Sequence, residues 1–291
     1  MRTPLLALVA LLPSALASAI EPHDRGVFSD LDDQVPLESA PPPPDARAPR
    51  LLVDDERGLA TLYYGDDPVA LLRAPLSAAA RAALPKGTLE RHGAPPRSED
   101  RDGDGIVDRL DIVRGAKKLL VNKAAYHERY VVLRYPGGDV ARTEGVCTDT
   151  IVRALRNAGI DLQREVHDDI VAARAAYPMV EKIDASINHR RVKTILVWFK
   201  RHTRRLAADD DYQPGDVVFF DTFPQKPGAE HVGIISDRRA RDGRWLVVNN
   251  WTDGAVDAEM ALLGAVPVTD HFRVAPAAAA AAGQRGRPAA P

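Results

Sequence analysis

The single cysteine of the chain, Cys147, lies where a helix is expected to begin, and this placement suits a nucleophile. Apolar residues recur at helical spacing through the stretch 142–159, which Gly159 ends. In the first turn of a helix, unpaired backbone N–H groups and the helix dipole favour a thiolate, so the sequence predicts a lowered cysteine pKa. The alternative is a small buried apolar residue, because free cysteine is often buried.

A histidine and an asparagine lie downstream in a run of predicted strands. The stretches 216–221, 231–236 and 245–250 are apolar enough to be inner strands of one antiparallel sheet, and His231 opens the middle one. If the helix of Cys147 packs on this sheet, the imidazole takes the thiol proton and returns it to the leaving group. Asn249 is expected to hold the histidine tautomer, since Asn250 points the opposite way on an ideal strand. The alternative for His231 is a hydrogen-bonded histidine at a strand start.

These residues and the strings around them, GVCTD, PGDVVFF and HVGII, resemble the NlpC-type papain-like peptidases of bacterial cell walls, over about residues 126–274. The resemblance implies a helix-on-sheet α+β fold and hydrolysis of an amide bond through a thioester. It also implies that the backbone N–H of Cys147 contributes to the oxyanion hole and that the substrate is the peptide part of peptidoglycan. The family usually has Asp-Cys-Ser at the nucleophile and His as the third residue, whereas this chain has Val146-Cys147-Thr148 and Asn249.

Three further residues, Asn250, Tyr135 and Asp149, are candidates for contacts with the substrate or the oxyanion. Tyr135 belongs to a group of tyrosines that either lines a pocket near the helix start or consists of ordinary strand aromatics. Two other functions stay open. The same Cys-His-Asn triad could serve an amidase or acyltransferase on another substrate, or the protein could be a calcium-stabilised, non-catalytic module that binds the cell envelope.

A second group of residues, in the stretch 100–111, has the spacing of an EF-hand calcium loop. Carboxylates this close repel one another unless a hard cation that prefers oxygen neutralises them. The predicted ligands, by side chain or, for Ile106, by backbone carbonyl, are Asp100, Asp102, Asp104, Ile106, Asp108 and Asp111. The loop resembles those of dockerin-like repeats, with Asp111 in place of Glu at its end. We expect one structural calcium ion, bound with a dissociation constant on the order of 0.1 to 1 mM; the alternative is an acidic surface turn.

The composition is that of an ordinary globular protein, with 291 residues, a net charge of -2 and 45% hydrophobic residues. No charge imbalance points to nucleic acid. Residues 1–19 combine Arg2, an apolar run and Ala17-Ser18-Ala19, which is typical of a secretory signal peptide cleaved after Ala19. We therefore expect a secreted or periplasmic monomer without a transmembrane segment in the mature chain, whose lone cysteine cannot form an intramolecular disulfide.

The predicted fold class is α+β, with a helix packed on a central antiparallel sheet and a small N-terminal β-hairpin or meander. Ser186 is expected to open a later helix, with Arg190 on its solvated basic side. The chain divides into a signal peptide at 1–19, a proline-rich linker at 20–50, a β-rich segment at 51–99, the calcium loop and its helix at 100–121, the hydrolase domain at 122–274 and a disordered tail at 275–291.

Overall fold

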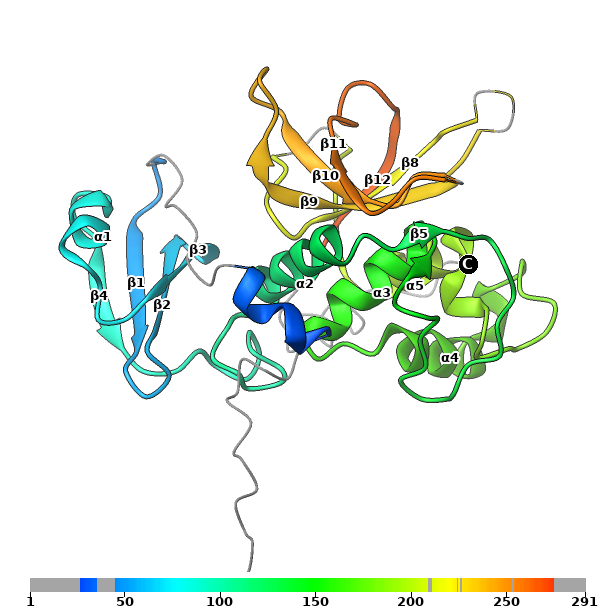
Figure 1. Cartoon of the computed structure of the whole chain (residues 1–291), viewed down its shortest axis with the longest axis horizontal. Coiled ribbons are helices and arrows are strands. Elements are labelled where there is room, and N and C mark those ends of the chain that lie inside the picture. The colour runs from blue at the N-terminus through cyan, green and yellow to red at the C-terminus, as the bar shows by residue number, and fades with distance from the viewer. Residues whose placement is uncertain are drawn as a thin grey trace, which may run out of the picture.

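The computed structural model describes residues 27–35, 45–208, 211–223, 225, 227–252 and 254–274. The expected signal peptide and tail lie outside the described residues, as does part of the expected linker. Within them, a helical layer lies against a six-stranded sheet, and a four-stranded sheet stands beside the helices (Figure 1). This arrangement confirms the predicted α+β class with antiparallel sheets.

The smaller sheet is formed by the N-terminal segment in the order β3-β2-β1-β4. Strands β1, β2 and β3 form the expected antiparallel meander, and β4 adds to β1 in parallel. The Oγ of Ser77 caps the short helix α1 by accepting the N–H of Ala80 at 3.1 Å. The elements are β1 (Pro49–Asp54), β2 (Leu59–Tyr64), β3 (Asp67–Arg73), α1 (Ala78–Ala83) and β4 (Leu89–His92).

The larger sheet has the order β11-β10-β9-β8-β12-β7, and every neighbouring pair is antiparallel. Three of its inner strands, β8, β9 and β10, are those expected from the apolar runs of the sequence, and the apolar residues of β8 and of the first half of β9 are buried. The strands are β7 (Arg204–Leu206), β8 (Val217–Phe220), β9 (His231–Arg239), β10 (Trp245–Asn249), β11 (Ala258–Met260) and β12 (Val268–Arg273).

The helical layer covers one face of this sheet (Figure 1). Helix α3 lies at its centre, packed against α2 and β9, and ends as expected before Gly159, which adopts φ 71°. The helix expected from Ser186 begins six residues later, because a separate turn, η4, precedes it. The helices are α2 (Asp108–Asn122), α3 (Cys147–Asn157), α4 (Leu162–Ala172), η3 (Arg174–Ala176), η4 (Asn188–Arg190) and α5 (Val192–His202).

Two stretches differ from the sequence-based expectation. The described part of the expected linker contains a short helix, η2 (Ser29–Gln34), which contacts α2 and buries Leu31. Residues 127–134, which follow β5 (Ala125–Tyr126), form no strand, although ordinary strand aromatics are one interpretation of the tyrosines in this region. Strand β5 pairs with β6 (Glu144–Gly145), and its Ala125 also bridges to Val256.

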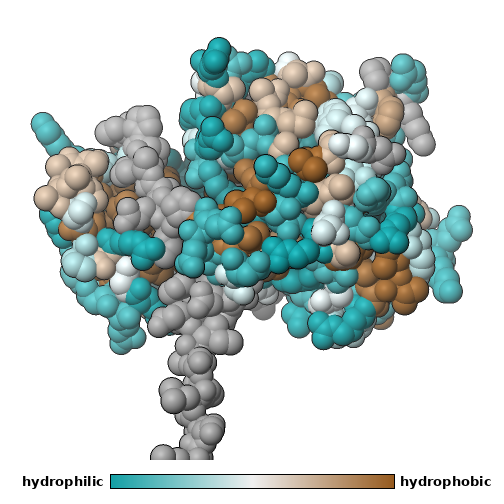
Figure 2. Space-filling model, in the orientation of Figure 1, coloured by the Kyte–Doolittle hydropathy of each residue, from teal (hydrophilic) through white to brown (hydrophobic). Residues whose placement is uncertain are grey.

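The face seen in Figure 2 is largely hydrophilic, with apolar side chains in small separate groups. Most apolar side chains of the helices and the sheet are turned inward, into a core that α3 and β9 share. Among the described residues, no helix combines the length and apolar character needed to cross a membrane.

Candidate active site

Cys147 is the first residue of α3 and lies in the contact between this helix and β9. Its side chain is only 5% exposed. Burial raises the pKa of the Cys147 thiol to about 12, and the negative charge of Asp149 acts in the same direction. The N–H groups of Val232, Thr148 and Cys147 itself oppose this shift but do not outweigh it. The prediction of a lowered cysteine pKa is therefore wrong for this structure, because desolvation exceeds the effect of the helix N-terminus.

His231 opens β9 and is 4% exposed. Its Nε2 lies 3.1 Å from Oδ1 of Asn249 on β10, and the ring of Trp251 packs edge-on at 4.6 Å between centroids. The amide of Asn249 is oriented by a second hydrogen bond, from its Nδ2 to the carbonyl of Val247 at 3.1 Å. Since Oδ1 only accepts, Nε2 carries the proton and Nδ1 is the unprotonated nitrogen. Burial lowers the pKa of His231 to about 4, so the ring is neutral at pH 7.

Cys147 packs among the apolar residues between α3 and the larger sheet, whereas the ring of His231 contacts Phe220, Trp251 and Asn249. Cys147 lies beside the backbone N–H of Val232, the residue that follows His231, and Asn249 holds the imidazole from the neighbouring strand. Asn250 points elsewhere, as expected from strand alternation: its Nδ2 donates to the carbonyl of Ala124 at 3.0 Å.

A cleft of about 1000 Å³ opens at the start of α3, with Cys147 and Thr148 in its lining. Its walls come from the segments 126–130 and 179–194, together with Glu230 beside His231. The walls carry both signs of charge: the acidic residues are Glu128, Glu181, Asp184 and Glu230, and the basic ones are Arg129, Lys182, Arg190, Arg191 and Lys193. A ligand with both carboxylate and ammonium groups would find partners here.

Asp149 holds the start of α3 in place. Its Oδ2 accepts the N–H of Val146 at 2.8 Å, the residue that precedes Cys147. The guanidinium of Arg190 binds both carboxylate oxygens, with Nε to Oδ1 at 2.8 Å and Nη2 to Oδ2 at 2.9 Å. Both side chains are buried, so Asp149 positions the helix, in contrast to the predicted contact with substrate or oxyanion.

Arg190 was not predicted as part of the site. The sequence places it on a solvated basic face, but it lies in η4 and is 6% exposed. It also donates Nη1 to the carbonyl of Arg129 at 3.1 Å, and its own carbonyl accepts Oγ1 of Thr148 at 3.0 Å. Arg190 therefore ties the nucleophile helix to the cleft wall, and nothing in the local sequence distinguishes it from the neighbouring basic residues.

Tyr135 turns away from the cleft. Its hydroxyl donates to Oδ1 of Asp168 at 3.0 Å, and its ring packs against His167 at 4.7 Å, so it contacts α4. Tyr126 and Tyr130 line the cleft instead. The predicted role of Tyr135 in binding substrate is not supported by this placement.

The predicted calcium ligands lie in the loop before α2 and in the first turn of that helix. Asp100, Asp102 and Asp104 come together, with one carboxylate oxygen of each within 4.8 Å of the others. Asp108 instead turns to Arg101, accepting its N–H at 2.9 Å and pairing with its Nε at 2.9 Å. Ile106 and Asp111 are buried at 1% exposure each.

The sequence of the chain matches proteins without an assigned activity. Residues 113–274 match the family described as "Domain of unknown function (DUF1287)". The chain is also similar to the "Uncharacterized protein YijF" of Escherichia coli (strain K12), at 41% identity over 157 residues, which is 52% of this chain and 75% of that protein.

Two solved structures, NlpC2 and NlpC1 from Trichomonas vaginalis, align with TM-scores of 0.34 and 0.35 at 14% and 17% identity. Each alignment covers 75% of this chain but only 58% and 55%, respectively, of those proteins. This chain therefore spans less than two thirds of either, and TM-scores this low do not establish a common fold.

The chain is an α+β protein in which a buried cysteine at a helix start packs against a strand that opens with a histidine. It belongs to the DUF1287 family, because the family match covers more than half of its residues and the match to YijF covers 75% of that protein.

Proposed function

We propose that this protein is an exported cysteine hydrolase that cleaves amide bonds in the peptides of peptidoglycan. The observation that supports the proposal is the position of Cys147, in the lining of the cleft and beside the backbone N–H of the residue that follows His231, together with the hydrogen bond between His231 and Asn249. The proposal assigns Cys147 as the nucleophile, His231 as the base and Asn249 as the residue that orients the base.

The proposed reaction starts from a protonated Cys147 thiol and a neutral His231 imidazole. As the sulfur of Cys147 attacks the amide carbon, its proton passes to Nδ1 of His231, and the backbone N–H of Cys147 stabilises the oxyanion. The imidazolium then gives the proton to the departing amine, so the C–N bond breaks and a thioester remains. Water, deprotonated by the same nitrogen, hydrolyses the thioester to a carboxylic acid and the free thiol. Asn249 keeps Nδ1 available throughout by accepting from Nε2.

Three features support a peptidoglycan peptide as the substrate. The sequence strings around the three residues resemble those of cell-wall peptidases, and the N-terminus has the composition of an export signal. In addition, the cleft offers both acidic and basic side chains, which suits a short peptide rich in free carboxylates and amines.

The test is incubation with purified muropeptides and identification of the products by mass. Wild-type protein should release fragments that together gain one water, and Cys147→Ala should lower the rate by at least about a thousandfold. Asn249→Ala should lower kcat by at least about tenfold, since loss of the tautomer is costly in such triads.

Matched controls are His231→Gln against His92→Gln, an exposed histidine on β4, and Asn249→Ala against Asn122→Ala on the exposed end of α2. Only the variants at the site, His231→Gln and Asn249→Ala, should lose activity. Equal products from wild type and Cys147→Ala would refute the proposal. Products joined to an added amine in place of water would instead identify an acyltransferase.

A further inference from the structure

The loop that precedes α2 lies at the junction of the N-terminal sheet and the helical layer. On one side, Nη2 of Arg57, from the turn between β1 and β2, donates to the carbonyl of Gly103 at 3.1 Å. The apolar residues at the end of the loop, Ile106 and Val107, pack with Leu59, Tyr63 and Leu71 of the N-terminal sheet. The loop therefore packs against the N-terminal sheet and leads directly into α2, whose Leu110 belongs to the same apolar cluster.

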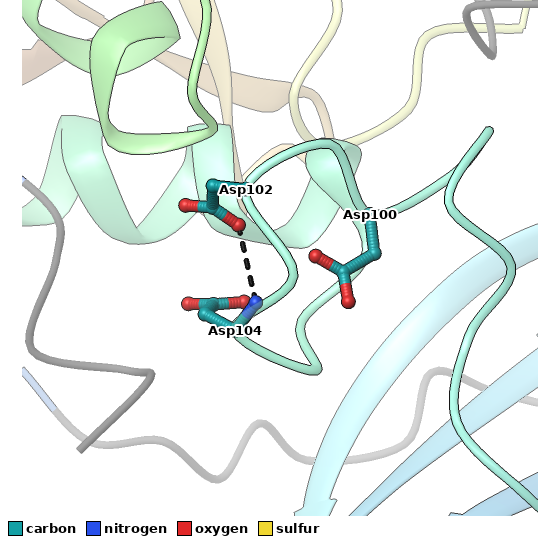
Figure 3. Close-up of side chains that lie close together, drawn as sticks. All are labelled: Asp100, Asp102 and Asp104. Atoms are coloured by element: carbon teal, nitrogen blue, oxygen red, sulfur yellow. Dashed lines mark hydrogen bonds between the residues drawn. The ribbon is translucent and has the colours of Figure 1, made fainter. Parts of the chain in front are cut away.

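Three carboxylates converge within this loop (Figure 3). Asp100 and Asp104 are 3% and 2% exposed, and the oxygens of the three groups lie within 4.8 Å of one another. Like charges this close, removed from water, are costly unless a cation joins them.

A fourth carboxylate provides an independent indication of a ligand. Asp111, on the first turn of α2, is 1% exposed, and among the described residues its Oδ2 has no hydrogen-bond partner. Its Oδ1 accepts Nδ2 of Asn157 at 2.7 Å. The negative charges of Asp104 and Asp102 act on Asp111, so its carboxylate lies near the cluster. A buried, unpartnered oxygen beside three carboxylates is what a bound cation would explain.

We propose that Asp100, Asp102, Asp104 and Asp111 bind one calcium ion, which joins the N-terminal sheet to the nucleophile helix. The oxygen donors suit a hard cation, and calcium tolerates the irregular geometry of such a loop better than magnesium does. The backbone carbonyl of Ile106 stays a predicted ligand. Asp108 does not belong to the set, because Arg101 holds its carboxylate.

The link to the active site runs through Asn157, the last residue of α3, whose first residue is Cys147. Its amide donates to the side chain and the carbonyl of Asp111, at 2.7 and 3.0 Å, and its Oδ1 accepts Nζ of the buried Lys118 at 2.9 Å. An ion that fixes Asp111 thereby fixes the C-terminal end of α3. The proposal concerns stability and does not depend on the hydrolase function.

The experiment uses the full chain carrying Cys147→Ala, so that catalysis plays no part. Thermal unfolding is measured in EDTA, in millimolar calcium chloride and in millimolar magnesium chloride, and calcium binding is titrated calorimetrically. Calcium should bind at one site per chain and raise Tm by about 5 °C or more, with a smaller shift in magnesium.

Asp104→Asn should abolish the calcium shift while leaving Tm in EDTA unchanged or higher, since it removes one repelling charge. The matched control is Asp66→Asn, at the exposed turn between β2 and β3, which should keep the full shift. The proposal is overturned if the chain with the unaltered loop shows the same Tm in calcium and in EDTA. It is also overturned if calcium raises the Tm of Asp104→Asn as much as that of Asp66→Asn. Either result would mean that the arginines around the loop neutralise it without an ion.

Discussion

Cys147 and His231 are both buried, and burial favours the uncharged form of each. A raised thiol pKa and a lowered imidazole pKa mean that the proton stays on sulfur at neutral pH, and that no thiolate–imidazolium pair exists before substrate binds. In the proposed reaction, proton transfer therefore accompanies attack on the carbonyl carbon, which is general-base catalysis by a neutral imidazole. Burial also limits oxidation of the lone thiol.

Alkylation of Cys147 by iodoacetamide tests this protonation state. Below the pKa, the thiolate fraction rises tenfold with each pH unit, so the rate in the folded protein should rise about tenfold per unit from pH 7 to 9 and show no plateau. The same chain unfolded in urea is the control, and its rate should level off near the ordinary thiol pKa of 9.0. A plateau below pH 8 in the folded protein would reveal a preformed thiolate.

At the scale of elements, the close pairing of β9 and β10 sets the distance between His231 and Asn249. Gly233 allows this approach, because a Cβ at that position would lie 2.4 Å from Cγ1 of Val247 and 3.0 Å from the carbonyl oxygen of Val248. Gly233 in the HVGII string is therefore needed for the close packing of β9 against β10, two residues from His231.

Gly233→Ala should push β10 away from β9 and lower the free energy of unfolding by about 1 to 3 kcal/mol. The kcat of hydrolysis should fall further than the loss of stability accounts for, because the distance between Asn249 and His231 increases. Urea unfolding and kcat measure the two effects. Because Cγ1 of Val247 is the nearest obstacle, the double variant Gly233→Ala/Val247→Ala should be less destabilised than the sum of the single changes. Simple additivity would show that the two positions do not meet.

At the scale of the whole molecule, the described part of the N-terminal segment is packed against the helices. Asp32 of η2 lies 2.5 Å from Nζ of Lys118 and 3.2 Å from Nη2 of Arg114, and the side chain of Lys118 is fully buried. A segment expected to be a linker therefore supplies the counter-charge for two buried cations on α2. Such charges are tolerated in a core only when they are paired.

Asp32→Ala should lower the free energy of unfolding by about 3 to 5 kcal/mol, because it leaves Lys118 buried without a carboxylate. Chemical denaturation of the full chain measures the change. Asp33→Ala, an exposed neighbour in the same short helix, is the control and should alter stability by less than about 0.5 kcal/mol. Equal effects of the two variants would show that η2 does not pair with α2 in solution.

The sequence by itself determined the local features: the strands that carry His231 and Asn249, the end of α3 at Gly159, and the spacing of the acidic loop. It also distinguished Asn249 from Asn250, because the two-residue period of a strand is a local property. Only the tertiary structure decided the burial of Arg190 beside Asp149, the pairing of Asp32 with Lys118 and the raised pKa of Cys147. Each of these depends on which distant element covers a side chain, and neither propensity nor periodicity encodes that long-range contact.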